Sequence, residues 1–376
     1  MVDIAVVGTG TMGAGIAESA AIAGLSVVMV DVSEVALDRG RGIIEKDLER
    51  WVKRDRISEE ERGEVLGRVS ATTDLGACAD ADVVVEAVIE DVEVKKKVFG
   101  DLEDAVAGEA VLATNTSSLS VAGIASATES PGRVVGMHFF NPVPAMRLVE
   151  VVTGPSTDPS VVRRVEKVAE RLGKTPIRVS DTPGFVVNRV ARPFYLEALR
   201  LVEAGEKPEQ IDASVRDAGF RMGPLELADL IGHDVNLAVS ESLFERYYYQ
   251  PRFRPSHLQR SMVEGGLLGR KCGRGFYDYG ERDKAEEEEV EPREDIALRI
   301  TSCIVNEAFL ARSEDVATAE DIDRAMKLGA NYPKGPFEWA EEIGVHSIVQ
   351  TLDALRTTHG DAYLVAPSLR ERAARA

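Results

Sequence analysis

One histidine in this chain stands where it could move a proton. His138 follows the apolar run Val134–Met137, and Glu150 lies further on, within the next apolar run, Leu148–Val152. A strand, a turn containing proline and a second strand would bring the two side chains together. A carboxylate on one imidazole nitrogen fixes the tautomer and raises the basicity of the other, so the pair could exchange a proton near neutral pH. A secondary alcohol that loses a hydride needs such a base, although a histidine beside an apolar strand can also be purely structural.

A glycine-rich turn supplies the site for a hydride acceptor. Gly8-Thr9-Gly10-Thr11-Met12-Gly13 follows the apolar run Ile4–Gly8 and opens a helical segment. The first glycine permits the turn, the second lets the backbone approach a pyrophosphate, and the third allows close packing of helix on strand. We therefore expect Gly8, Gly10, Thr11, Met12 and Gly13 to bind a dinucleotide. The alternative is a structural turn.

An acidic residue at the end of the next strand indicates which dinucleotide. Asp31 comes directly after the apolar run Ser26–Val30, the second predicted strand. Its carboxylate could accept hydrogen bonds from the ribose hydroxyls and would repel a 2′-phosphate. The sequence therefore predicts NAD as the cofactor, ahead of NADP and FAD, and the alternative for Asp31 is a helix cap.

A further polar segment follows another predicted strand. Asn115-Thr116-Ser117-Ser118 comes directly after Ala110–Thr114, as His138-Phe139-Phe140-Asn141-Pro142 comes after Val134–Met137. Ligands of open α/β sheets bind outside the carboxyl ends of the strands. We expect both segments at that edge.

The pattern of the chain predicts the elements that hold these residues. Up to residue 182, short Val- and Ile-rich runs alternate with helix-length segments such as Met12–Ala23 and Val35–Val52, which is typical of a parallel sheet covered on both faces. After Pro183 the apolar residues recur every three or four positions, which predicts an all-α region. The fold class is a Rossmann-type α/β domain followed by an all-α domain.

The helical region contains a repeat. Glu197-Ala198, Ile211-Asp212, Gly223-Pro224-Leu225-Glu226 and Ile231-Gly232 recur, in the same order and at a nearly constant offset, as Glu307-Ala308, Ile322-Asp323, Gly335-Pro336-Phe337-Glu338 and Ile343-Gly344. We predict two tandem copies of the all-α domain. The acidic stretch Glu281–Asp295 is expected to be a linker. The predicted domains are 1–182, 183–284 and 285–376.

Composition excludes several classes of function. The chain has 64 acidic and 45 basic residues, a net charge of -19, and only 12 lysines, which argues against binding nucleic acid. We interpret this balance as adaptation to high salt, with an acidic, arginine-rich protein from a GC-rich genome as the alternative.

The sequence also bears on where the protein is found. No apolar run is long enough to span a membrane, and the N-terminus carries no basic secretory region. The three widely spaced cysteines form neither a disulfide framework nor a metal site, so we expect a cytoplasmic protein without metal.

Several motifs together resemble a known family. They are Asn115-Thr116-Ser117-Ser118-Leu119, His138-Phe139-Phe140-Asn141-Pro142, Leu148-Val149-Glu150-Val151, Pro183-Gly184-Phe185-Val186-Val187-Asn188-Arg189 and Gly273-Arg274-Gly275-Phe276-Tyr277. In order and spacing they resemble the L-3-hydroxyacyl-CoA dehydrogenases, most closely the bacterial 3-hydroxybutyryl-CoA type. The resemblance covers about residues 1–280, and residues 290–376 look like a second copy of the family's C-terminal domain.

The resemblance implies an activity and roles for individual residues. The activity is reversible oxidation of a (3S)-3-hydroxyacyl-CoA to the 3-oxoacyl-CoA by NAD, in fatty-acid β-oxidation or short-chain hydroxybutyryl-CoA metabolism. His138 resembles the general acid/base and Glu150 its partner, while Ser117 and Asn188 resemble residues that position the substrate. Cofactor contacts are implied for Asn115, Ser117, Asn141, Glu90, Lys95 and Lys271. For Lys95 and Lys271 the alternative is surface charge, and for Asn188 it is capping or packing.

Three questions stay open at this level. Lys53 and Arg54 could meet the phosphates of coenzyme A, or could simply belong to a charged helix face. A sugar-acid or hydroxy-acid dehydrogenase of the L-gulonate type and a non-catalytic NAD-binding protein of the crystallin type are alternative functions. The two helical copies are expected to pair within one chain, which would be a monomer or a homodimer. Arg299-Ile300-Thr301 stands about where Asn188-Arg189-Val190 does, so the second copy lacks the asparagine and should be structural.

Overall fold

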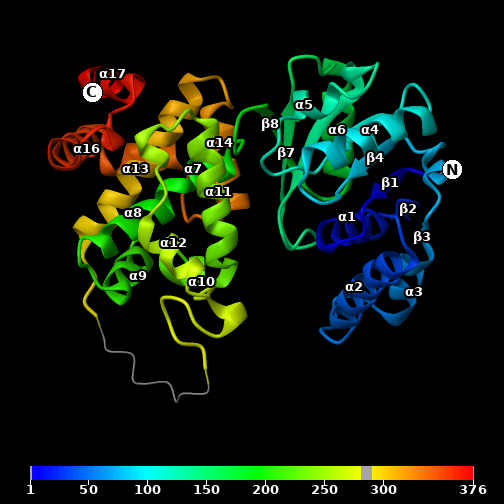
Figure 1. Cartoon of the computed structure of the whole chain (residues 1–376), viewed down its shortest axis with the longest axis horizontal. Helices are drawn as coiled ribbons and strands as arrows, with labels where there is room; N and C mark the ends of the chain where they lie inside the picture. The colour runs from blue at the N-terminus through cyan, green and yellow to red at the C-terminus, as the bar shows by residue number, and fades with distance from the viewer. Residues whose placement is uncertain (1, 281–289, 376) are drawn as a thin grey trace. The chain divides into compact units, whose positions relative to one another are not determined.

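The computed structural model describes residues 2–280 and 290–375. The chain forms two compact units, which divide between Phe185 and Val186. The first unit is an α/β domain and the second is helical (Figure 1). The division of the helical region into two domains at residues 284 and 285 stays a prediction, since residues 281–289, which include most of the expected linker, lie outside the described residues.

The first unit is built on one eight-stranded sheet with the order β3-β2-β1-β4-β5-β6-β7-β8. Its strands, in chain order, are β1 (Ile4–Val7), β2 (Val27–Val30), β3 (Val69–Thr72), β4 (Val83–Glu86), β5 (Val111–Thr114), β6 (Val134–Phe139), β7 (Leu148–Thr153) and β8 (Thr175–Ser180). Strands β1, β2, β4 and β5 are buried along their whole length, in keeping with their Val-rich sequences.

The sheet is parallel, as predicted, except at one junction. β6 and β7 pair antiparallel, and β8 pairs parallel with β7. The connection between Phe139 and Leu148 is too short for a parallel crossover, which needs about a dozen residues or more. β3 and β8 were not predicted, because both lie at sheet edges: no residue of β3 is fully buried, and in β8 only Ile177 and Val179 are.

Helices cover both faces of this sheet. Buried side chains of α1 (Thr11–Ile22), α2 (Glu34–Val52), α3 (Glu59–Gly67) and α6 (Pro159–Arg171) share one core with alternate strand residues such as Val6 and Val85. The residues between them, such as Ala5 and Val84, are equally buried. The remaining helices are α4 (Val92–Ala105) and α5 (Val121–Ala125), which pack on each other. The central strands therefore present apolar side chains in both directions.

The second unit contains only helices, short 3-10 turns and isolated β-bridges in its described residues. Its helices are α7 (Val187–Val190), α8 (Arg192–Glu203), α9 (Pro208–Asp217), α10 (Pro224–Ile231), α11 (His233–Arg246), α12 (His257–Glu264), α13 (Glu294–Ser313), α14 (Ala319–Gly329), α15 (Pro336–Ile343), α16 (Val345–His359) and α17 (Pro367–Arg375). The predicted helical region is confirmed. Helix α13 begins at Glu294, just before the expected end of the linker at Asp295.

Helices α8 and α13 pack against each other in the core of this unit (Figure 1). Two ion pairs, one buried and one partly buried, connect α13 to α7 and to α8. Arg189 Nε lies 2.7 Å from Glu307 Oε1, and Arg299 Nε lies 3.0 Å from Glu197 Oε2. The pairs are reciprocal, because Arg189 and Arg299 are separated along the chain by the same offset as Glu197 and Glu307. The two ion pairs therefore join residues at the nearly constant offset of the sequence repeat.

Candidate active site

The glycine-rich turn between β1 and α1 has the geometry that a dinucleotide requires. Gly8 has a φ of 96°, and a Cβ there would lie 2.7 Å from the carbonyl carbon of Ala87. A Cβ on Gly13 would lie 1.8 Å from Gly8 O, whereas one on Gly10 would meet nothing within 4 Å. The first and third glycines are therefore needed for packing. The second leaves open space beside the backbone.

The start of α1 suits an anion. Gly10 is the N-cap and gives no side-chain hydrogen bond, so the first-turn N–H groups at Thr11 and Met12 have no side-chain cap. A helix N-terminus of this kind attracts a phosphate group. Asp31 follows β2 and accepts hydrogen bonds from Thr9 N at 2.7 Å and from Val32 N at 2.8 Å. The carboxylate is thereby fixed at the edge of the sheet beside the turn, and these residues fit NAD.

His138 and Glu150 lie directly opposite each other on the antiparallel strands β6 and β7. The distance from His138 Nδ1 to Glu150 Oε2 is 2.6 Å, and both side chains are buried. The rings of Phe140 and Phe185 lie 4.6 and 5.6 Å from the imidazole. The predicted approach is confirmed, with one correction: His138 is inside β6 rather than after it, because the strand extends to Phe139. With Nδ1 bound to the carboxylate, Nε2 is the nitrogen that can exchange a proton.

The loop after β5 is organised by a single carboxylate. Glu90 Oε1 accepts hydrogen bonds from Thr116 Oγ1 at 2.6 Å, from Ser117 N at 2.9 Å and Oγ at 3.3 Å, and from Ser118 N at 3.1 Å and Oγ at 3.2 Å. Burial alone would raise the pKa of Glu90, but these hydrogen bonds and the charge of Lys95 outweigh it and lower the pKa. Glu90 is thus an anion that holds the Ser117 hydroxyl in place. Asn115 connects the same loop to β6, because its Oδ1 accepts from Phe139 N at 2.9 Å.

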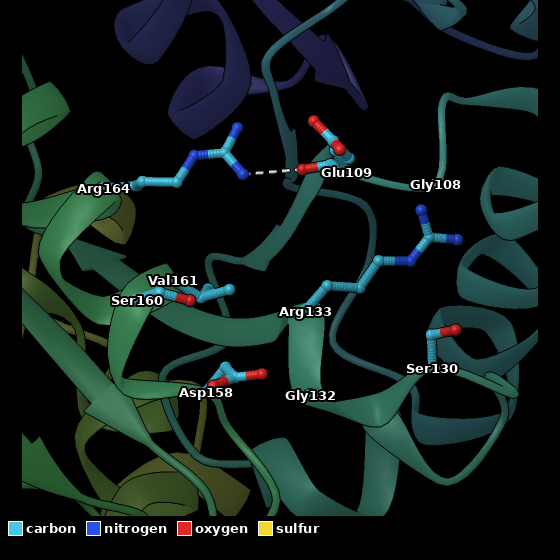
Figure 2. Close-up of a pocket in the computed structure, with 9 residues that line it drawn as sticks. All are labelled: Gly108, Glu109, Ser130, Gly132, Arg133, Asp158, Ser160, Val161 and Arg164. Carbon is cyan, nitrogen blue, oxygen red and sulfur yellow. Dashed lines mark hydrogen bonds between the residues drawn. The ribbon is translucent and has the colours of Figure 1, made fainter.

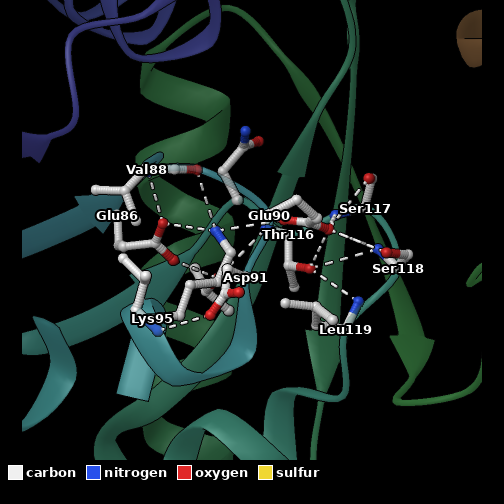
Figure 3. A network of polar contacts seen from close by, with 12 residues as sticks. Glu86, Val88, Glu90, Asp91, Lys95, Thr116, Ser117, Ser118 and Leu119 are labelled. Carbon is white, nitrogen blue, oxygen red and sulfur yellow. Dashed lines mark hydrogen bonds and ion pairs between the residues drawn. The ribbon is translucent and has the colours of Figure 1, made fainter. Parts of the chain in front are cut away.

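Behind Glu90 lies a buried ion pair that the sequence interpretation missed (Figure 3). Lys95 Nζ is 2.6 Å from Glu86 Oε1 and 3.4 Å from Glu90 Oε2. Glu86 also accepts from Val88 N and from Thr114 Oγ1, each at 2.7 Å. Lys95, expected from the resemblance to contact the cofactor, is only 1% exposed and binds these two carboxylates. One feature of the sequence could have indicated this ion pair: a single glutamate, Glu86, ends the otherwise apolar run Val83–Glu86.

The other predicted residues are dispersed. Asn141 is exposed and precedes a cis proline, Pro142. Asn188 is half-buried in α7, and Lys271 forms an ion pair with Asp234. In the first unit Lys53 and Arg54 are exposed at the end of α2, and Lys53 is 2.8 Å from Glu49. A helix-surface role therefore accounts for Lys53.

A pocket elsewhere in the first unit contains none of these residues. Figure 2 shows its lining side chains, among them Arg133, Arg164, Asp158 and Glu109. They precede β5 and β6 or follow β7, so they lie at the edge of the sheet opposite to the carboxyl ends of the parallel strands. Among residues 2–280 and 290–375, no cluster of His, Cys, Asp or Glu could hold a metal ion, and no helix is long and apolar enough to cross a membrane.

Two family models match the chain and divide it as the two units do. The model of the 3-hydroxyacyl-CoA dehydrogenase NAD binding domain matches residues 3–182. The model of the 3-hydroxyacyl-CoA dehydrogenase C-terminal domain matches residues 184–279 and 296–376. Together they cover nearly the whole chain.

Relatives agree with these models. The 3-hydroxyadipyl-CoA dehydrogenase of Escherichia coli K12 is 38% identical over 98% of this chain and 97% of its own. A 3-hydroxybutyryl-CoA dehydrogenase of Mycobacterium tuberculosis is 45% identical over 73% of this chain and 98% of its own. The crystal structure of 3-hydroxybutyryl-CoA dehydrogenase from Escherichia coli K12 superposes with a TM-score of 0.94 at 37% identity, covering 100% of this chain and 98% of the other. This chain therefore belongs to the 3-hydroxyacyl-CoA dehydrogenase family, and it is an NAD-dependent oxidoreductase.

Proposed function

We propose that this enzyme oxidises (3S)-3-hydroxyacyl-CoA thioesters reversibly to 3-oxoacyl-CoA, with His138 as the acid/base. The observation that carries the proposal is the 2.6 Å contact between His138 Nδ1 and Glu150, which leaves Nε2 for the substrate hydroxyl. The nucleotide turn on the same sheet supplies the partner for a hydride. NAD held by this turn and Asp31 would supply the acceptor for the hydride from C3 of the substrate.

The chain's own residues handle the proton. Nε2 of His138 takes the proton of the C3 hydroxyl as the C3–H bond breaks, and it returns a proton in the reverse direction. Glu150 keeps the hydrogen on Nδ1 and stabilises the imidazolium that forms. Phe140 and Phe185 limit water beside the ring. In this proposal Ser117, held by Glu90, hydrogen-bonds the oxygen on C3.

The remaining roles are assigned on the family resemblance. Asn188 positions the substrate. The residues assigned to the cofactor are Gly8, Gly10, Thr11, Met12, Gly13, Asp31, Glu90, Asn115, Asn141 and Lys271. The buried Lys95 would act on the cofactor only through Glu90, with which it pairs. Lys53 and Arg54 are retained as candidates for the phosphates of coenzyme A. A cytoplasmic location and the salt preference stay predictions.

The direct test is an assay of the purified protein with acetoacetyl-CoA and NADH. We expect reduction of the thioester and no activity on free hydroxy acids such as L-gulonate. The opposite pattern would favour the sugar-acid alternative, and binding of NADH without any turnover would favour the crystallin type.

A second test concerns the choice of cofactor. The value of kcat/KM with NADH should exceed the value with NADPH by at least tenfold, about 1.4 kcal/mol, because Asp31 repels the 2′-phosphate. Equal values at matched ionic strength contradict that assignment.

We also propose that the helical unit consists of two tandem copies that pair as a pseudo-dimer. The reciprocal contacts Arg189–Glu307 and Arg299–Glu197 support a twofold relation. Two acidic residues at corresponding positions support it further. Asp212 accepts from Leu225 N and Glu226 N, and Asp323 accepts from Phe337 N and Glu338 N.

The second copy is proposed to be structural. At the offset that separates Arg189 from Arg299, Leu298 would correspond to Asn188, so the second copy would lack the asparagine. The full chain should then be a monomer by light scattering, or a dimer through other surfaces. Deleting 285–376 should expose the apolar face of α8 and cause aggregation or forced dimerisation. A stable, fully active monomer after this deletion contradicts the pairing.

A further inference from the structure

Glu86 is a buried carboxylate to which the proposed function gives no role. It ends β4, and its side chain is fully buried. Its Oε1 accepts from Lys95 Nζ at 2.6 Å and from Val88 N at 2.7 Å. Its Oε2 accepts from Thr114 Oγ1 at 2.7 Å. Glu86 thereby connects the ends of β4 and β5 with α4, all within the first unit.

Two routes lead from Glu86 to the loop after β5 (Figure 3). One runs through Lys95, whose Nζ lies 3.4 Å from Glu90 Oε2. The other runs through Thr114, whose Oγ1 donates to Glu86 and accepts from Thr116 N at 3.3 Å. The first route therefore ends on the carboxylate that organises the loop, and the second ends on the loop itself.

The charges of these side chains indicate what Glu86 does for Glu90. Lys95, only 1% exposed, lies closer to Glu86, at 2.6 Å, than to Glu90, at 3.4 Å. A buried ammonium group destabilises the fold unless a carboxylate neutralises it. Because Glu86 meets that requirement, Glu90 Oε1 is left to accept from Ser117 N at 2.9 Å and Oγ at 3.3 Å. Without the charge of Glu86, Glu90 would have to neutralise Lys95 and would be drawn away from the loop.

Glu103 shows a carboxylate of the same domain in a structural role. It lies near the other end of α4, where it accepts from Glu129 N at 2.6 Å and Ser130 N at 2.9 Å and pairs with Arg133 at 3.3 Å. These donors precede β6, so they lie at the opposite edge of the sheet from the Ser117 loop. Glu103 therefore serves as a matched control for Glu86, with three donors and one cation.

We propose that Glu86 is a positioning residue, which acts through its contacts behind the loop after β5 to hold the Ser117 hydroxyl at the oxygen on C3 of the substrate. In this role Glu86 neutralises Lys95 and leaves Glu90 to the loop. The inference rests on the proposed function, which gives Ser117 its contact with the substrate. Because Glu86 is fully buried, it acts only through these neighbours.

A double-mutant cycle on the reduction of acetoacetyl-CoA by NADH tests the proposal. One donor to a developing oxyanion contributes roughly 10²–10³ in kcat, so Ser117→Ala should lose about that factor. Glu86→Gln keeps the size and removes the charge, and it should lower kcat about tenfold by releasing Ser117 in part. In the Ser117→Ala background, Glu86→Gln should change kcat by less than about twofold, since its effect passes through the missing hydroxyl.

Two controls separate positioning from stability and from cofactor binding. Glu103→Gln should lower the melting temperature while keeping kcat within about twofold of wild type, because its donors lie away from the site. Glu86→Gln should keep the Kd of NADH, measured by fluorescence titration, within about threefold of wild type.

Should Glu86→Gln fail to fold in a thermal melt, Thr114→Val decides. It keeps every charge and removes only the second route, and it should lower kcat at least about threefold in the wild type and less than about twofold in Ser117→Ala. Thr114→Ser, which keeps the hydroxyl, should retain wild-type kcat. An unchanged kcat in Thr114→Val then overturns the proposal.

The remaining outcomes are separable. Equal losses of kcat from Glu86→Gln with and without the Ser117 hydroxyl overturn the proposal, and so does wild-type kcat in a folded Glu86→Gln. A raised Kd for NADH at unchanged kcat also overturns it, since Glu86 then serves the cofactor. These results leave the proposed function intact as long as Ser117→Ala loses activity. Wild-type kcat in Ser117→Ala, or a wild-type enzyme that turns over no thioester, defeats the proposed contact of Ser117 and this inference together.

Discussion

The protein contains two buried histidines paired with carboxylates, one in each unit, and only one of them is placed for catalysis. His138 Nδ1 lies 2.6 Å from Glu150 in the α/β unit, and His233 Nε2 lies 2.7 Å from Asp229 in the helical unit. By distance and burial the pairs are nearly the same. What differs is what surrounds each pair.

Asp229 is a structural anchor. Besides His233, it accepts hydrogen bonds from Phe276 N, Tyr277 N and the Tyr279 hydroxyl, each at 3.0 Å. Burial alone would raise the pKa of Asp229, but these donors, with His233 first among them, lower it. The carboxylate thereby ties the segment that follows Lys271 to α10. His233 is fully buried and its Nδ1 has no partner in the described chain, so no substrate reaches it.

The His138–Glu150 pair occupies the carboxyl ends of the parallel strands, beside the Ser117 loop that Glu90 organises. The comparison teaches that a short contact between histidine and carboxylate does not by itself indicate an acid/base. Access to the second ring nitrogen and proximity to ligand-binding groups decide the role.

The largest effect should come from His138→Gln. Because a positioned acid/base contributes roughly 10²–10⁴ in rate, kcat should fall by that factor while the fold and NADH binding remain. Steady-state kinetics, circular dichroism and fluorescence of bound NADH check this. The matched variant His233→Gln should keep kcat within about threefold. More than a tenth of wild-type kcat in His138→Gln would show that the comparison assigns the roles wrongly.

Glu150→Gln should produce a comparable or smaller loss of kcat, because glutamine keeps a hydrogen bond to Nδ1 but cannot stabilise the imidazolium. The pH profile of kcat should shift with it, which a purely structural residue would not cause. An unchanged profile and rate would mean that Glu150 only packs β7.

Asp229→Asn should instead affect stability. An amide cannot accept from all the donors that face Asp229, and unsatisfied buried donors cost roughly 2–4 kcal/mol in the free energy of unfolding. Urea denaturation measures the loss. Asp234→Asn, at an exposed ion pair with Lys271, should cost less than about 1 kcal/mol. Similar losses in the free energy of unfolding for both variants would show that Asp229 stabilises the protein no more than the exposed pair of Asp234 and Lys271 does.

Glu18 is a further buried carboxylate, and it differs from Glu150 and Asp229 because no hydrogen-bond donor faces it in the described chain. Neither oxygen of Glu18 has a hydrogen-bond partner in the described chain, and burial, with a smaller effect of Asp47, raises its pKa to about 8. The stability contributed by the protonated form is fully present below about pH 4.5, the value expected in the unfolded chain, and is lost as pH rises through about 8.

Glu18→Gln should therefore flatten the fall in the free energy of unfolding between pH 5 and 9. Burial lowers the pKa of the neighbouring Lys174 to about 8, and its contribution is present at high pH and lost as pH falls through that value. The Lys174 contribution therefore changes only above about pH 8, and the fall between pH 5 and 8 belongs to Glu18. Parallel stability curves for the variant and the wild type between pH 5 and 9 would contradict the assignment.

Much of the site was predictable, because it depends on backbone patterns. The glycine spacing, the strand that ends before Asp31, and the two apolar runs that bring His138 and Glu150 together are local features, and local sequence determines turns, strands and their spacing. The repeat within the helical region was likewise readable from the sequence, because its matching motifs recur in one order and at a nearly constant offset.

Other features were decided by the tertiary structure alone. Lys95 is a buried partner of Glu86 and Glu90 rather than a surface charge, and Arg192 is a buried cation held by Asn236 and Ser240. The ion pairs of Arg189 with Glu307 and of Arg299 with Glu197 likewise form only when the helices pack. Composition and periodicity show where a charged residue stands along an element. Whether its charge is paired depends on side chains that are distant in sequence and meet only when the elements pack.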